Sequence, residues 1–178
     1  MTPETDITIN PADGVLERDG DQAVLRFERS LGHPVDRVWA ALTEPSEIRG
    51  WLADADIDLV PGGRVELRWR NTDQDGNQAV ATGTITALDA PRLLEFDTVP
   101  HGRLRWELRP DGDATRLTLT VTVPSADDTV MLALAGWHIH LEHLADALAG
   151  RPVDWPRWNE DHLPRWEEIH AQYVAQAS

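Results

Sequence analysis

Six consecutive segments that alternate apolar and polar residues, followed by one long helical segment, constrain the fold of this chain most strongly. The alternation runs through residues 55–123 with little interruption, and short turns such as Asp75-Gly76 separate the segments. Strict alternation is typical of strands with one buried and one wet face, and short turns join neighbouring strands in antiparallel order. We therefore expect an antiparallel meander with a single apolar face.

The period then changes to that of a helix over residues 127–149. Its apolar residues recur in steps of three and four: Leu134, Trp137, Leu141, Leu144 and Leu148. Such spacing places them in one stripe along the helix. One helix cannot cover six or seven strands, so a twisted sheet must curl around it. A cupped sheet of this kind tends to leave a cavity between its concave face and the helix, where apolar ligands commonly bind.

The N-terminal third supplies the remaining elements. Residues 14–31 predict a hairpin around the turn at Asp19-Gly20, and two short helices are expected to open at Pro34 and Pro45. The fold class is therefore α+β, with a curved antiparallel sheet wrapped around a long C-terminal helix and two short helices after the first strand.

The chain is expected to form one domain with two appendages. Its 178 residues suit a single domain. We predict a polar N-terminal tail over residues 1–13, the domain over residues 14–150, and an extension over residues 151–178 that is rich in Trp and ends in a short helix.

Composition limits the partners. The formal net charge of -15 and the lack of a concentrated basic patch argue against nucleic acid and anionic membranes. No apolar run approaches the ~20 residues that span a bilayer, so membrane insertion is not expected. The chain has no Cys, and its N-terminal residues lack the pattern of a signal peptide. We therefore expect a cytoplasmic protein without disulfides or thiolate metal sites.

Several motifs together resemble a known superfamily. Gly62-Gly63 before a strand, Gly83 and Gly136-Trp137 match, as do these N-terminal positions: Pro34, Val38-Trp39, Ala41-Leu42-Thr43, Pro45, Ile48 and Trp51. Over residues 14–150 the chain resembles the START-like, or SRPBCC, superfamily, and most of all the group named for the activator of the heat-shock protein 90 ATPase. The resemblance implies a helix-grip fold with a cavity under the last helix. It implies no universal catalytic residue, because the superfamily includes lipid carriers, cyclases and co-chaperones.

The face of the sheet expected to look inward carries no Asp, Glu or Arg over the segments assigned to it, from Ile57 to Val121. General acid–base catalysis needs a titratable group within reach of the substrate, so this lining favours binding over catalysis. Large indoles such as those of Trp69 and Trp106 can both stack on a ligand and orient it. The predicted ligand-pocket residues are Trp51, Leu67, Trp69, Phe96, Trp106, Met131, Leu134 and His138.

The histidines of the last helix suggest a metal site at first. At about 100° per residue, however, His138 and His140 fall on opposite flanks of the stripe. His140 and His143 share a side that we expect to be exposed and to face away from the sheet, and a functional zinc site needs at least three protein ligands. We therefore predict no metal and no other cofactor. His138 remains a weak candidate for a catalytic base, or else a histidine at the edge of the core that bonds a carbonyl.

Two apolar residues project from the far side of the same helix. Leu132 and Ile139 lie about opposite the stripe, and exposed apolar pairs often mark contacts. We expect the C-terminal extension, or a second subunit in a homodimer, to cover them.

Three functions remain open. The first is binding of a small apolar molecule or lipid in the internal cavity. The second is an enzyme of the polyketide cyclase or hydrolase type that uses the same cavity, although no catalytic motif is complete. The third is a co-chaperone-like protein that binds through its outer surface. A cavity, a converging polar cluster and an exposed patch, respectively, would distinguish them.

Overall fold

The computed structural model describes residues 13–72 and 75–177. Over these residues eight strands form one antiparallel sheet in the order β1-β2-β8-β7-β6-β5-β4-β3. The strands are β1 (Val15–Asp19), β2 (Gln22–Leu31), β3 (Ala53–Ile57), β4 (Arg64–Thr72), β5 (Gln78–Asp89), β6 (Leu93–Val99), β7 (Gly102–Asp111) and β8 (Ala114–Pro124). The hairpin and the six-stranded meander expected from the alternation are both present.

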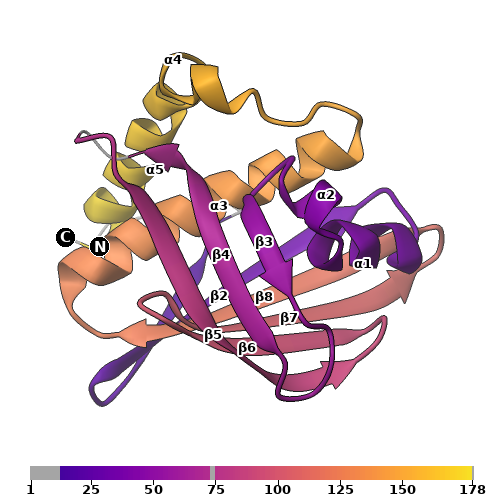
Figure 1. Ribbon diagram of the computed structural model, residues 1–178. Helices are drawn as coiled ribbons and strands as arrows, with labels where there is room; N and C mark the ends of the chain where they lie inside the picture. The colour runs from indigo at the N-terminus through magenta and orange to yellow at the C-terminus, as the bar shows by residue number, and fades with distance from the viewer. Residues whose placement is uncertain (1–12, 73–74, 178) are drawn as a thin grey trace, which may run out of the picture.

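One long helix lies in the curl of the sheet, which confirms the α+β helix-grip fold. This helix, α3 (Asp127–Leu148), crosses the concave face, as Figure 1 shows. The short helices α1 (Val35–Thr43) and α2 (Pro45–Ile48) close one end. They follow the first two strands, because the N-terminal hairpin contributes both β1 and β2.

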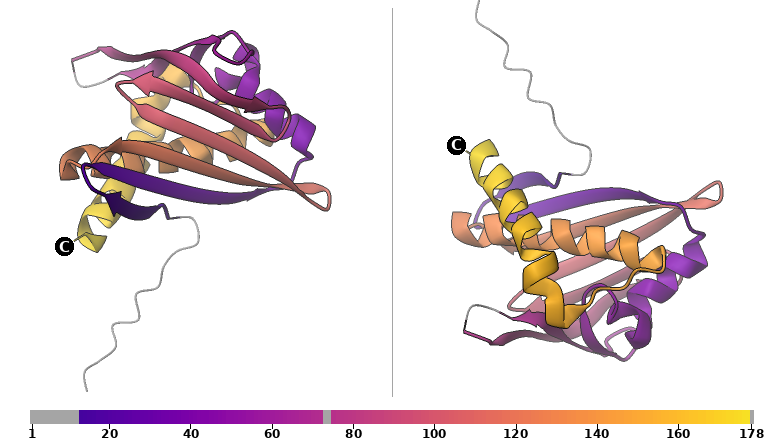
Figure 2. Two further views of the ribbon diagram at one scale, coloured as in Figure 1. Left: turned by 90° about the horizontal axis from the view of Figure 1, so that it is seen from below. Right: turned by 90° about the horizontal axis from the view of Figure 1, so that it is seen from above.

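The C-terminal extension forms a third layer over the helix. A single helical turn over Trp155–Arg157 leads into α4 (Trp158–Asp161) and α5 (Leu163–Gln176). Helix α5 packs against α3 on the side away from the sheet, as Figure 2 shows from above. A polar tail was expected over residues 1–13, and residues 1–12 lie outside the described part of the chain. The division into a domain over residues 14–150 and an extension over residues 151–178 remains a prediction.

The alternation in sequence becomes alternation in burial. On β7, Leu104, Trp106 and Leu108 are buried. Between them Arg105 points to the other face and pairs with Glu95 across the strand, 3.0 Å away. One residue departs from the alternation expected between Ile57 and Val121. Leu59 continues the apolar positions of Ile57 and was expected to face inward, but β3 ends at Ile57 and Leu59 is exposed.

The backbones of β5 and β6 approach each other closely where the sheet curves. A Cβ atom on Gly83 of β5 would lie 1.8 Å from the carbonyl oxygen of Asp97 on β6, so no larger residue fits there without movement. The β5–β6 register also shifts between Ile85 and Ala87. Such irregularities bend a strand and increase its twist, which helps the sheet close around α3.

Helix α3 is buried on nearly all sides, and this corrects the expectation for its histidines. His140 and His143 are 4% and 2% exposed, not surface residues. A stripe of apolar residues predicts a helix with one wet face, but here the extension covers that face. Ile139 is likewise buried, as expected for a residue under the extension, whereas Leu132 remains 51% exposed. No helix in the described residues is long and apolar enough to cross a membrane.

Candidate ligand pocket

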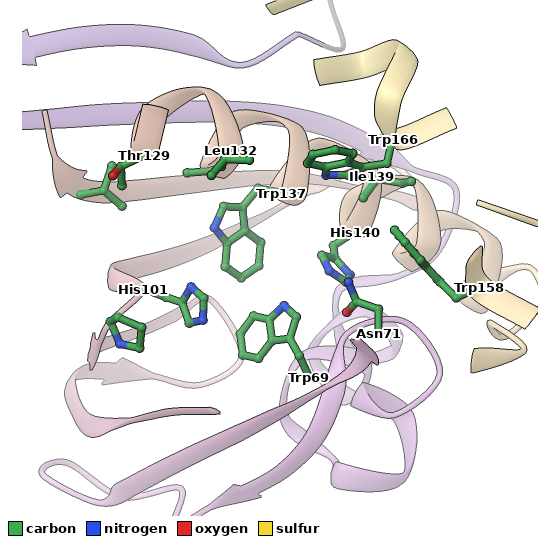
Figure 3. Close-up of a pocket in the computed structure, with 14 residues that line it drawn as sticks. Trp69, Asn71, His101, Thr129, Leu132, Trp137, Ile139, His140, Trp158 and Trp166 are labelled. Atoms are coloured by element: carbon green, nitrogen blue, oxygen red, sulfur yellow. The ribbon is translucent and has the colours of Figure 1, made fainter. Parts of the chain in front are cut away.

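A pocket of about 340 Å³ lies at one end of the concave face. Strand β4 contributes Trp69 and Asn71, the β6–β7 turn contributes His101, and α3 contributes Trp137 and His140. The C-terminal extension completes the wall with two tryptophans, Trp158 and Trp166. Figure 3 shows these side chains around a common space. The described lining residues include no Asp, Glu or Arg.

Local geometry explains how these side chains converge. Trp69 and Asn71 are two residues apart on β4, so they point to the same face of the sheet. On α3, Ala133, Trp137 and His140 are spaced by four and three residues, which places them on one side of the helix. The β6–β7 turn closes at Gly102, whose φ of 80° favours glycine, and it presents His101 to the pocket.

Aromatic rings form the walls. The rings of Trp69 and His101 stack with centroids 4.6 Å apart and planes inclined by 21°. Trp137 meets Trp69 edge to face at 6.3 Å. Both are preferred arrangements for aromatic pairs, and they hold the two indoles at the border of the pocket in fixed orientations.

The imidazoles of the pocket are neutral at ordinary pH. Burial lowers the pKa of His140 to about 4, although the bond between its Nδ1 and the carbonyl of Trp51, 3.0 Å long, acts to raise it. Because that carbonyl can only accept, Nδ1 carries the proton, and Nε2 is left as an acceptor. Burial also lowers the pKa of His101. The pocket is therefore polar at a few points but uncharged.

The residues predicted for the pocket are divided between hollow and core. Trp69 lines the pocket. Trp51 and Trp106 pack edge to face at 5.8 Å in the closed core, where three more of the predicted residues are also buried: Leu67, Phe96 and Leu134. Met131 borders a different hollow, of about 710 Å³, between α3 and α5.

His138 lies outside the pocket lining and belongs to a hydrogen-bonded chain under α5. The Gly14 N–H donates to Tyr173 Oη at 2.7 Å, which leaves the hydroxyl proton for His138 Nδ1, also at 2.7 Å. The other ring nitrogen, Nε2, lies 3.5 Å from Glu142 Oε1. Burial acts to raise the pKa of Glu142, but hydrogen bonds from His138 and Arg165 outweigh it and hold that pKa at about 2. His138 thus fastens α5 to α3 and is bonded to a hydroxyl, not to a carbonyl.

Sequence reasoning missed most of the lining: Asn71, His101, Trp137 as a wall residue, His140, Trp158 and Trp166. One signal was available for Asn71, which continues the alternation of Trp69. His101 lies in a turn, and the two extension tryptophans are distant in sequence, so nothing local connects them. Among residues 13–72 and 75–177, no group of three or more His, Asp or Glu side chains is arranged to hold a metal ion.

Solved structures share this fold over most of the chain. The crystal structure of CalU16 from Micromonospora echinospora has a TM-score of 0.71 at 24% identity, covering 92% of this chain and 96% of that one. A Bordetella parapertussis protein gives 0.67 at 29% identity, covering 92% and 90%. A Nitrosomonas europaea protein gives 0.63 at 24% identity, covering 75% and 97%. A comparison with curated proteins finds no match.

A family model matches residues 32–149, which include both short helices, β3 to β8 and all of α3. The match stops before the extension that contributes Trp158 and Trp166 to the pocket. The chain therefore belongs to the family described as activator of Hsp90 ATPase homolog 1-like protein.

Proposed function

We propose that this protein binds a small, largely apolar molecule in the pocket between β4, the β6–β7 turn and α3. The observation that carries the proposal is a hollow of about 340 Å³ walled by indole rings. Ligand sites are typically concave and apolar, with a few placed polar groups and volumes of ≈ 300–1,000 Å³. This pocket has that composition and lies at the small end of the range.

Membership of a helix-grip fold supports the proposal, because the space between sheet and last helix commonly holds hydrophobic ligands in such folds. The two alternative functions, a cyclase or hydrolase and a co-chaperone, are not favoured by any particular contact in the described residues. His138, the candidate base, is engaged with Tyr173 outside the pocket lining. A cytoplasmic location and a homodimer remain part of the proposal, and size-exclusion chromatography with light scattering tests the dimer.

Gly136 offers a sharp test because it lines the pocket from the middle of α3. A Cβ atom built on it meets nothing within 4 Å. The substitution Gly136→Leu should therefore fill the pocket without disturbing the core. Gly136→Ala is the matched control, since a single methyl leaves most of the volume open. Both replacements suit a helix better than glycine, and Gly136→Ala should stabilise the fold by about 0.5–1 kcal/mol.

The neutral fluorophore prodan serves as the probe. We expect the wild type and Gly136→Ala to bind it with similar affinity, seen as a blue-shifted emission, and Gly136→Leu to bind at least about tenfold more weakly, as expected when a ring loses its site. Circular dichroism and thermal unfolding should show all three folded. Equal binding by Gly136→Leu, or no binding of prodan and no ligand retained from a lipid extract by the wild type, would refute the proposal.

A further inference from the structure

Two buried polar atoms on the pocket have no partner in the described part of the chain. Four buried side-chain nitrogen or oxygen atoms lack a hydrogen bond there, and two of the four are Asn71 Oδ1 and His101 Nε2, both on pocket-lining residues. An unsatisfied buried polar group costs about 1–3 kcal/mol, and each one in a native protein calls for an explanation. A ligand group placed beside these atoms would satisfy them.

The chemistry of Asn71 Oδ1 is unambiguous. An amide oxygen accepts hydrogen bonds and cannot donate them, so its missing partner must carry an O–H or N–H. Figure 3 shows the Asn71 amide bordering the space between Trp69, Trp137 and His140. His101 Nε2 is a second polar contact, and the ring of His101 is already held in place by stacking on Trp69.

The pocket also limits the charge of its ligand. No Asp, Glu or Arg is among the described lining residues, so an ionised ligand would be desolvated without a counter-ion. The same desolvation keeps the pKa values of His101 and His140 low, which shows how unfavourable a positive charge is at this position. A neutral molecule avoids both penalties.

The walls limit its shape. Trp69 and Trp137 are inclined by 83°, and one face of Trp69 is covered by His101. A flat ring that stacks on Trp137 therefore lies nearly perpendicular to Trp69. Offset stacks and edge-to-face contacts are the geometries that aromatic rings prefer. A planar ring system therefore gains more from these walls than a flexible acyl chain, which would also lose rotational freedom on binding.

We infer, on the basis of the proposed binding function, that the ligand is a neutral, planar aromatic molecule with a hydroxyl or N–H group. That group donates to Asn71 Oδ1, and His101 Nε2 offers a second polar contact on the same pocket. Asn71 and His101 are then the residues that determine specificity in an otherwise apolar pocket.

The test compares naphthol with its methyl ether, which has the same ring and no donor. In displacement of prodan from the wild type, naphthol should bind about tenfold more tightly than the ether, the effect of one buried hydrogen bond. Naphthoate and the naphthylmethyl ammonium ion should each bind at least about tenfold more weakly than naphthol. This comparison requires no variant, so a folding defect cannot obscure it.

Variants of Asn71 and His101 then test which residue bonds the hydroxyl of naphthol. In Asn71→Leu the preference for naphthol should fall to less than about twofold, while affinity for the ether stays the same. His101→Phe keeps the stack on Trp69 and should lower affinity for naphthol by about threefold. Thr82→Val, at an exposed position of β5 outside the pocket lining, should leave the preference unchanged.

The outcomes separate the two proposals. If prodan and the ether bind but naphthol shows no advantage, or if Asn71→Leu keeps the advantage, the inference about the ligand fails and the binding function stands. If none of the ring compounds binds the wild type, the proposed function itself fails.

Discussion

The two ends of the concave face contain the same kind of residue and behave differently. At the end closed by α1 and α2, Trp51 and Trp106 pack edge to face, and the Trp51 Nε1–H donates to the carbonyl of Ala41 at 2.8 Å. At the other end, Trp69 and Trp137 border a pocket. Trp106 and Trp137 also meet edge to face at 5.9 Å, so one row of four indoles runs from the filled end to the hollow one.

The difference lies in what surrounds each indole. Near Trp51, two helices and the strands supply neighbours on every side, and Trp51 is 1% exposed. Near Trp69, the wall is completed by a turn and by a C-terminal extension beyond the matched family region. Whether a tryptophan lies in the core or lines the pocket thus depends on the elements that pack around it. Its position in the sequence does not decide between the two.

The largest loss of stability should come from a substitution at the end of the concave face that α1 and α2 close. Trp106→Ala removes a buried indole from a site where Trp51 and Trp137 fix its neighbours, so a cavity must remain. We expect a loss of about 3–5 kcal/mol in the free energy of unfolding, measured by urea denaturation followed by circular dichroism. A loss below about 2 kcal/mol would show that this end is as loosely filled as the other.

The next effect concerns pH and the histidines beside the pocket. The folded pKa of His140 is depressed to about 4, so the unfolded chain binds more protons between about pH 6.5 and pH 4. The stability due to neutral His140 is present above pH 6.5 and is lost as pH falls through that window, by up to about 3 kcal/mol. Burial, then repulsion by His140 and His162, lowers the pKa of His143 to about 3 and extends the loss to lower pH.

Urea denaturation at several pH values measures this slope, and His140→Gln, which keeps a polar side chain but cannot titrate, is the comparison. We expect the variant to have a flatter dependence between pH 6.5 and 4. Parallel curves for the two proteins would mean that folding does not lower the pKa of His140.

Trp69→Ala should separate stability from binding. Because one side of Trp69 borders the hollow, its removal should cost about 2 kcal/mol, less than the loss for Trp106→Ala. Prodan binding should be lost, while Trp106→Ala, where still folded, should retain it. Equal losses of stability for Trp69→Ala and Trp106→Ala would show that the two ends of the concave face are packed equally well.

The smallest effect tests the fastening of the extension. Tyr173→Phe removes the hydroxyl that bonds His138 and the Gly14 amide, leaving the buried His138 ring and the half-buried Gly14 N–H without this partner. We expect a loss of about 1–2 kcal/mol and faster hydrogen exchange in α5 than in β7. Val174→Ala, on the same helix but 43% exposed, is the control and should change stability by less than about 0.5 kcal/mol.

Much of the fold could be predicted because its signals are local. The alternation from Val65 to Val121 indicated the meander, and the stripe from Leu134 to Leu148 indicated the gripping helix. The site was less accessible. Trp69 lines the pocket, whereas Trp51 and Trp106 carry the same signal and lie in the core. His140 and His143 were misplaced because the stripe alone cannot show that a third layer covers the opposite face.

By itself, the sequence determined the elements, their order and the side of each strand that turns inward, because the periods of two and 3.6 residues are properties of the backbone. The tertiary structure decided where the hollow lies and which polar atoms border it. A cavity forms where side chains from β4, a turn, α3 and the extension fail to fill the space between them, and that depends on distances between segments that no local pattern records.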